Sequence, residues 1–164
     1  MNSKPLINIR RIAAHDRPWM ERVWIESWGG DFMITKGKIH RLSELEGFVA
    51  EADNERLGLV TFEIARSELE ITSLNSFSEN RGIGLALVSE VTNLAKKEQL
   101  TRIWLITTND NLNALRFWQK RGFKLLKVYP DAVANTRKLK PTIPIIGENG
   151  IPLRDEIELE LQLA

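Results

Sequence analysis

The sequence predicts an α/β (α+β) fold: a mixed, mostly antiparallel sheet of about six to seven strands with helices on both faces. Three observations favour this class. The apolar residues of 82–97 recur at helical spacing between segments that follow strand periods. The run 102–107 is almost continuously apolar, as in a strand covered on both faces, and a strand after a crossover helix is usually parallel to the one before it. Residues 156–163 alternate strictly and predict a half-buried strand at the end of the chain.

Length and composition predict one globular domain spanning 1–164, since the chain has 164 residues with 43% hydrophobic and 27% charged side chains. A formal charge of +1 gives no reason to expect a nucleic-acid or membrane partner. The chain has no cysteine, which excludes disulfides, thiol catalysis and thiolate metal sites, and no metal is expected. No apolar run reaches membrane-spanning length and no secretory segment follows Met1, so we expect a cytoplasmic protein.

The first third of the chain is expected to hold one strand and one helix. Apolar residues within 5–12 predict the strand. Asp16 can cap a helix whose first turn tolerates Pro18, and Gly29 with Gly30 ends it. The elements that follow are a short apolar segment at 32–34, a turn at 36–38, and two antiparallel strands at 47–52 and 56–65.

The centre of the chain, 69–100, combines a strand, a glycine loop and a helix. Gly82 and Gly84 leave the backbone N–H groups at the helix start open to close approach, which suits an anion such as a pyrophosphate. Arg81 adds a formal charge and a forked donor. An ordinary strand-to-helix turn that needs glycine only for its dihedral angles is the alternative. A dinucleotide fingerprint is excluded, because Leu87 stands where the third glycine would be.

A second helix is expected after the polar residues 108–111, with Trp118 on its apolar face and Gly122 at its end, and a strand over 123–128. The segment 131–155 has no strong periodicity and is longer than an ordinary connection, so we expect it to be functional or partner-bound, as in a homodimer interface. Its basic residues could bind an acidic group of a substrate or form a solvated charge run; they are Arg137, Lys138 and Lys140.

Two stretches resemble a known family. Residues 74–87 resemble motif A, and residues 111–123 resemble motif B, of the GNAT superfamily of acyl-CoA-dependent N-acyltransferases. The resemblance implies a GNAT-type fold and acetyl-CoA as cosubstrate. It also implies direct transfer of the acetyl group to a primary amine of a small molecule or peptide.

The resemblance assigns the cofactor-binding residues as follows. The backbone of Leu74 and Ser76 would pair with the pantetheine arm. The loop after the strand would cradle the pyrophosphate through its backbone N–H groups, and the second helix would line the far side of the cofactor. The loop residues are Arg81, Gly82, Ile83, Gly84 and Leu85, and those of the second helix are Asn111, Ala114 and Trp118.

Two positions depart from the family's pattern. Glu79 stands where the family usually has glutamine or arginine, and Trp118 stands where a tyrosine often protonates the leaving thiolate. An indole N–H donates hydrogen bonds but is not a usable acid. The alternative function is therefore a catalytically weakened acyl-CoA-binding module with a regulatory or interaction role.

The catalytic candidates follow from strand position and side-chain chemistry. Backbone N–H groups of Leu74 and Asn75 would stabilise the developing oxyanion. Glu70, by its place on the central strand, and His40, because an imidazole titrates near neutral pH, are the candidate general bases. The alternatives are a solvated strand carboxylate and a histidine in a surface loop. Aromatic residues that could line the acceptor pocket or simply fill the core are Trp24, Trp28 and Phe32.

Overall fold

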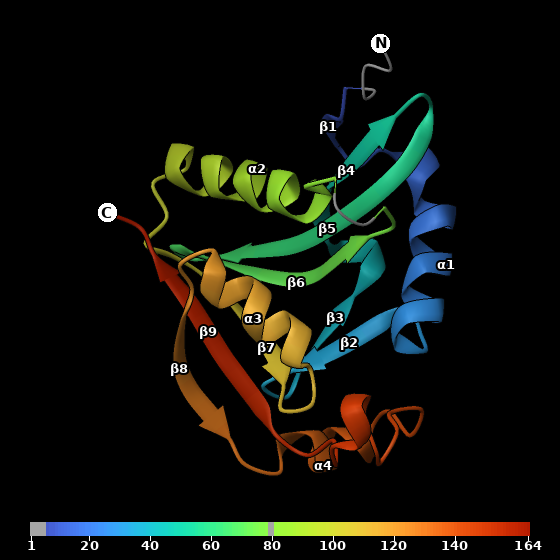
Figure 1. Cartoon of the computed structure of the whole chain (residues 1–164), viewed down its shortest axis with the longest axis vertical. Helices are drawn as coiled ribbons and strands as arrows, with labels where there is room; N and C mark the ends of the chain where they lie inside the picture. Colours follow the sequence, from blue (N-terminus) through green and yellow to red (C-terminus); the bar gives the residue numbers. More distant parts are fainter. Residues whose placement is uncertain (1–5, 79–80) are drawn as a thin grey trace.

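The computed structural model describes residues 6–78 and 81–164, and Figure 1 shows a seven-stranded sheet at its centre. The strands lie in the order β1-β4-β5-β6-β7-β9-β8. Strands β6 and β7 are parallel, and all other neighbours are antiparallel, which confirms the predicted mixed, mostly antiparallel sheet. The bounds are β1 Asn8–Arg11, β4 Glu46–Ala52, β5 Glu55–Ala65, β6 Glu68–Ser76, β7 Arg102–Thr108, β8 Lys124–Tyr129 and β9 Glu156–Gln162.

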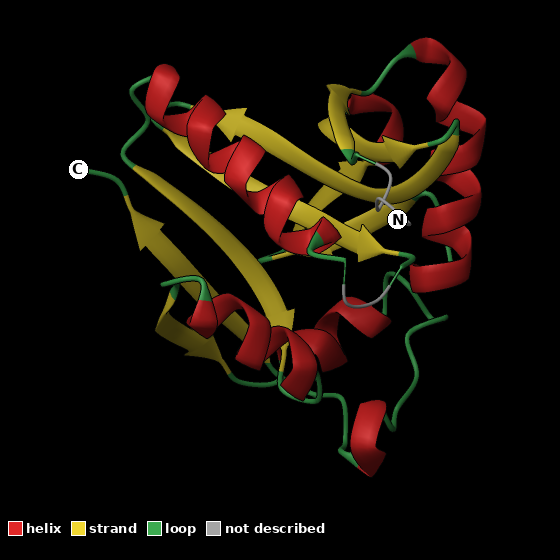
Figure 2. Ribbon diagram, turned by 45° about the horizontal axis from the view of Figure 1, so that its top comes forward, coloured by secondary structure: helices red, strands yellow, loops and turns green. Residues whose placement is uncertain are grey.

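Helices cover both faces of this sheet. Helices α2 (Ile83–Lys97) and α3 (Leu112–Lys120) lie on the face turned toward the viewer in Figure 2. Val60 of β5 belongs to the core that α2 covers, whereas its neighbour Leu59 packs in a second core with α1 (Arg17–Trp28). Successive strand residues point to opposite faces, so α1 covers the other side of the sheet. No helix within the described parts of the chain has the length and apolarity of a membrane span.

A small hairpin stands apart from the main sheet. Its strands are β2 (Phe32–Thr35) and β3 (Lys38–Arg41), joined by a turn in which Lys36 and Gly37 have φ angles of 50° and 76°. The expected turn was placed correctly, but β3 was not predicted. The reason is that its pattern is inverted: Ile39 is exposed while His40 is buried.

Asp16 has a different role from the predicted one. Its side chain makes no cap to α1. It is fully buried at the end of a short 3-10 helix, where it accepts two hydrogen bonds from Arg10 at 2.7 and 2.9 Å and one from Nε of Arg56 at 3.0 Å. The Arg10 guanidinium holds the pKa of Asp16 well below its usual range. The three 3-10 helices are η1 (Ala14–Asp16), η2 (Leu42–Glu44) and η3 (Glu148–Gly150).

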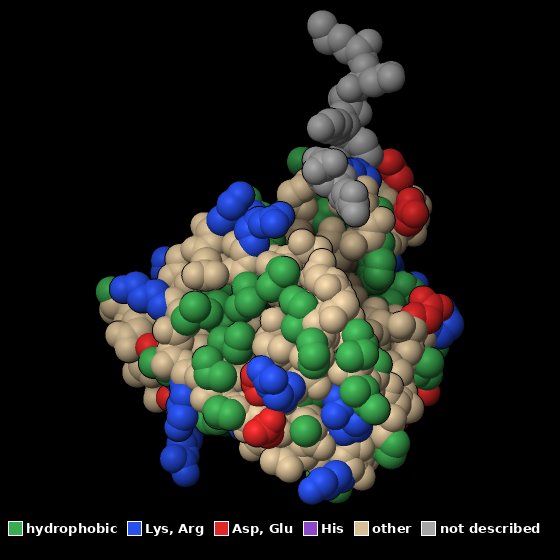
Figure 3. All heavy atoms as spheres, turned by 60° about the horizontal axis from the view of Figure 1, so that its bottom comes forward, with side chains coloured by type: hydrophobic (Ala, Val, Ile, Leu, Met, Phe, Trp, Pro, Cys, Tyr) green, Lys and Arg blue, Asp and Glu red, His purple; other side chains and the backbone are tan. Residues whose placement is uncertain are grey.

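The segment 131–155 is ordered and begins with helix α4 (Ala132–Arg137), which periodicity did not reveal. Arg137 donates to the carbonyls of Ile143, Pro144 and Leu153. Lys140 is buried and donates to the Phe32 carbonyl at 2.8 Å, and burial lowers its pKa. Arg137 therefore holds the segment together and Lys140 attaches it to β2, whereas Lys138 is exposed to solvent. Hydrophobic side chains gather on the face shown in Figure 3, which includes the end of the molecule that α4 occupies.

Candidate active site

The parallel strands β6 and β7 separate halfway along their length. They pair from Glu68 opposite Arg102 to Ile71 opposite Leu105. Beyond that point β6 pairs only with β5, and β7 only with β9. A bulge at Thr72 coincides with the separation, and bulges bend the strand that carries them. The two strand ends, 72–76 and 106–108, therefore border a gap within the sheet.

The backbone of β6 offers hydrogen-bonding groups to this gap. The N–H of Phe77 donates to the carbonyl of Leu57 at 2.8 Å, so Phe77 faces β5. Backbone groups of successive strand residues point to alternate edges, which places those of Asn75 toward β5 and those of Leu74 and Ser76 toward the gap. Of the two expected oxyanion donors, the Leu74 amide therefore faces the gap, and the Asn75 amide does not.

Helix α2 begins at one end of the gap and leaves its first N–H groups open. Gly82 has a left-handed φ of 70°, and its carbonyl accepts from Ala86, so the amides of residues 83–85 have no helical acceptor. A Cβ atom added at Gly82 would meet nothing within 4 Å, so this glycine is needed for its dihedral angle, in line with the structural alternative.

This helix start also has an electropositive neighbour. Nη2 of Arg81 is buried and finds no acceptor among the described residues. Free amides beside a buried, unpaired guanidinium nitrogen fit a diphosphate. Glu79, the departure noted in the sequence, lies outside the described residues.

Helix α3 lies beside the start of α2. A Cβ atom at Gly84 would lie 3.4 Å from the ring of Phe117. The side chain of Asn111 caps α3 by accepting from the N–H of Ala114 at 3.0 Å. Trp118 is 6% exposed and packs edge-on against Phe117 and Phe123, each at 5.0 Å between ring centroids, so it offers little surface to a ligand.

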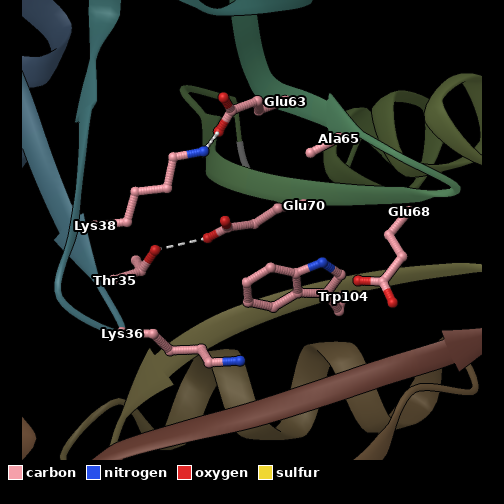
Figure 4. Close-up of a pocket in the computed structure, with 8 residues that line it drawn as sticks. All are labelled: Thr35, Lys36, Lys38, Glu63, Ala65, Glu68, Glu70 and Trp104. Atoms are coloured by element: carbon pink, nitrogen blue, oxygen red, sulfur yellow. Dashed lines mark hydrogen bonds and ion pairs between the residues drawn. The ribbon is translucent and has the colours of Figure 1, made fainter.

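The two candidate bases lie together on the other face of the sheet. Glu70 is 5% exposed and His40 is 2% exposed, so the alternatives of a solvated carboxylate and a surface histidine are wrong. Nε2 of His40 lies 3.3 Å from Oε1 of Glu70. Thr35 Oγ1 donates to Oε2 of Glu70 at 2.7 Å, and the two side chains point toward each other in Figure 4.

A cavity of about 240 Å³ opens beside Glu70, between the hairpin and the sheet. Three carboxylates, one indole and two lysines of the hairpin line it, and both lysines are held in ion pairs, Lys36 with Glu158 and Lys38 with Glu63. Such a lining suits a cationic or amine-bearing molecule. The lining residues are Thr35, Lys36, Lys38, Glu63, Ala65, Glu68, Glu70 and Trp104.

Two buried carboxylates of β9 lie on the same face. Burial raises the pKa of Glu156, against a hydrogen bond that it accepts from the N–H of Lys36 at 3.1 Å. Burial alone would also raise the pKa of Glu158, but hydrogen bonds from Arg102, Lys36 and Tyr129 outweigh it and lower that pKa. The ammonium group of Lys36 lies 3.0 Å from Glu158 and 4.9 Å from the centre of the Trp104 ring.

Of the three aromatic residues expected near the acceptor, Trp24 belongs to the core, whereas Trp28 and Phe32 are half-buried. Trp24 is fully buried, donates from Nε1 to Oγ of Ser73 at 3.2 Å, and meets Trp28 edge-on. Sequence reasoning missed Thr35, Glu63 and Trp104. Strand alternation could have put Glu63 and Trp104 on the face of Glu70, whereas Thr35 needed the hairpin.

Known proteins resemble this chain in sequence or in fold. YdhI of Bacillus subtilis (strain 168), an uncharacterized protein, is 48% identical over 131 residues, which is 79% of this chain and 82% of YdhI. A GNAT family acetyltransferase from Elizabethkingia anophelis, with acetyl-CoA bound, matches with a TM-score of 0.73 and 23% identity over 96% of this chain and 98% of its own. Arabidopsis thaliana Naa50, in complex with the bisubstrate analogue CoA-Ac-MVNAL, matches with a TM-score of 0.69 and 14% identity over 96% and 99% of the two chains.

At these sequence identities, the two solved structures show only that the fold is shared. Residues 10–123 match the model of the acetyltransferase (GNAT) family, which is more than half of the chain. This match includes both stretches that resembled motifs A and B, and it confirms that resemblance. The chain is therefore a member of the GNAT family of acetyltransferases.

Proposed function

We propose that this protein transfers the acetyl group of acetyl-CoA directly to a primary amine of a small molecule or peptide. The observation that carries the proposal is the gap between β6 and β7, which begins where their pairing ends after Ile71. The open helix start of α2, where we propose that the anion binds, lies on one face of the sheet, and a buried carboxylate, Glu70, lies on the other. The acetyl-CoA bound to one relative and the peptide-bearing analogue bound to another support both halves of this assignment.

The residues around the gap fit coenzyme A. Arg81 and the amides of residues 83–85 would hold the diphosphate, and the gap-facing backbone of Leu74 and Ser76 would pair with the pantetheine arm as an added strand does. Asn111 and Ala114 at the start of α3 would line the far side. Acetyl-CoA, when bound, supplies an acetyl group activated as a thioester.

The acceptor amine would enter the cavity beside Glu70. Glu70 takes a proton from the ammonium group, which frees the nitrogen lone pair for attack on the acetyl carbonyl. The C–S bond of the thioester then breaks, and the coenzyme A thiolate leaves and takes up the second proton that the nitrogen loses. The N–H of Leu74 donates to the negative charge that develops on the acetyl oxygen. The protein would hold acetyl-CoA and the amine on either side of one gap. This fixes their relative orientation, which two molecules that meet in solution lack.

A second candidate is an acyl-CoA-binding module with weakened turnover, because Trp118 is buried in the place of a tyrosine acid. Calorimetry with acetyl-CoA tests binding, and thiol release with a panel of primary amines tests transfer. Binding with thiol release supports the enzyme, and binding without it supports the module. Absence of binding contradicts both.

Glu70→Gln is the matched variant for catalysis. It keeps the shape of the side chain but cannot accept the proton. We expect a loss of about 100-fold or more in the rate constant of transfer, with unchanged affinity for acetyl-CoA. A variant as active as the wild type would contradict the assignment of Glu70.

A further inference from the structure

A continuous line of polar side chains leads away from Glu70. Thr35 Oγ1 lies 2.7 Å from Oε2 of Glu70 and 2.7 Å from Nε2 of His40. The same imidazole nitrogen lies 3.3 Å from Oε1 of Glu70. The inner carboxylate is therefore joined to one side of the His40 ring both directly and through a hydroxyl group.

The other side of the ring leads to the surface. Nδ1 of His40 lies 3.2 Å from Oε2 of Glu63, whose side chain is 34% exposed. Lys38 forms an ion pair with the same carboxylate at 2.8 Å and, as the largest influence, lowers the pKa of Glu63. A buried imidazole thus connects an inner carboxylate to an outer one that water reaches.

The proposed transfer needs such a connection. Conversion of an ammonium group and a thioester into an amide and a thiol releases one net proton per turnover. Glu70 is almost fully buried and lines the cavity that the acceptor would fill, so a proton that it accepts needs another path to solvent while acceptor or product is bound. A histidine between two carboxylates can pass a proton from one ring nitrogen to the other.

Resting on the function proposed above, we propose that Thr35, His40 and Glu63 form a proton relay from Glu70 to solvent. Glu70 gives its proton to the oxygen of Thr35, whose own proton moves to Nε2 of His40. The ring releases the proton on Nδ1 to Glu63, which passes it to water. After the product has left, the proton on Nε2 passes back through Thr35 to water in the emptied cavity, and Glu63 returns a proton from water to Nδ1, which restores the starting tautomer. Of these four residues, only Glu70 takes the proton from the acceptor, and the other three act through it.

Other charged groups near the relay have partners of their own. Glu156 of β9 accepts from the N–H of Lys36, and the Lys36 ammonium group pairs with Glu158. A metal ion is the competing explanation, because ligand atoms of His40, Glu63 and Glu70 lie within 4.8 Å of one another. The two carboxylates face different ring nitrogens, however, which is the geometry of a hydrogen-bond chain.

The kinetic test uses Glu63→Gln, which keeps the shape of the outer group but removes its capacity to accept a proton. We expect kcat to fall about tenfold while KM for acetyl-CoA stays unchanged. Added imidazole should restore kcat, because a soluble base can take the proton at the surface. Thr35→Val should lower kcat similarly. The control is Glu46→Gln, the same change at an exposed ion pair with Arg11, which should behave as the wild type.

A second readout does not depend on turnover. The chain has two histidines, His15 and His40, so their ring nitrogens can be followed individually by 15N NMR. We expect Glu63→Gln to shift the Nδ1 signal of His40 and Thr35→Val to shift its Nε2 signal.

Three results would overturn the relay. They are wild-type kcat in both Glu63→Gln and Thr35→Val, a kcat loss in Glu63→Gln that imidazole does not relieve, or wild-type activity that EDTA abolishes. A wild type that releases no thiol with any amine would contradict the proposed function instead. The NMR shifts then decide the relay alone, and unchanged His40 signals would refute it.

Discussion

Replacing Gly84 by glutamate should remove the affinity for coenzyme A through charge. A Cβ atom at this position would lie 3.4 Å from the Phe117 ring, an ordinary contact, so the backbone has room for a side chain. Two unit charges about 6 Å apart at a protein surface repel by about 2.8 kcal/mol, and physiological salt screens roughly half of this. A diphosphate carries about two charges, so the total is about 2.6 kcal/mol, or about 100-fold in the dissociation constant.

The matched control is Gly84→Gln, which adds the same volume without the charge. Calorimetry with acetyl-CoA should give an affinity about 100-fold lower for glutamate than for glutamine, and a difference that shrinks as salt is added. A carboxylate in the first turn of α2 suits the helix dipole, so the free glutamate variant should be at least as stable as the glutamine variant. Equal affinities at low salt would refute a diphosphate site at this helix start.

Three further changes test other parts of the molecule. Arg81→Ala should weaken coenzyme A more than a pantetheine analogue without the diphosphate in the same titration, and equal losses would speak against a phosphate contact. Trp118→Tyr should leave a gap beside Phe117 that lowers the free energy of unfolding by about 1–3 kcal/mol, while thiol release stays unchanged or rises; a large fall in release would give the indole a role in shaping the site. Asp16→Asn should lower the free energy of unfolding by about 3 kcal/mol at neutral pH, because it leaves the Arg10 guanidinium without its buried partner. The pKa of Asp16 is depressed in the folded state, so its contribution to the free energy of unfolding is complete above the unfolded-state pKa of about 3.9 and declines below it. In urea unfolding, the free energies of the variant and the wild type should therefore approach each other as the pH falls into the acid range. A difference that stays constant with pH would contradict the pKa shift.

The parts of the fold that the sequence predicted are those in which side-chain pattern and burial agree. Strand β9 alternates, and its pattern matches one face packed on the core. Strand β3 fails this agreement because a histidine points inward, toward two carboxylates, and an isoleucine points outward. Helix α4 has six residues, too few for a visible period, and Val133 is its buried residue.

In the candidate site, too, one part could be predicted from the sequence and another could not. The helix start at Gly82 was predictable because a local rule, an open helix N-terminus without side chains, points to anions. The cluster around Glu70 was not, because Thr35 and His40 reach Glu70 from the hairpin of β2 and β3, which lies far from β6 in the chain. Such a contact exists only once the hairpin has folded onto the sheet.

The gap between β6 and β7 has a consequence for solvent exchange in the free protein. Amides of Leu74 and Ser76 face water there, whereas those of Ser73 and Asn75 donate within the ladder to β5. Deuterium exchange should therefore be fast at Leu74 and Ser76 and slow at Ser73 and Asn75, so that it alternates along this strand end. A ligand that lies along the gap as a strand should slow exchange at Leu74 and Ser76 and leave exchange at Ser73 and Asn75 unchanged.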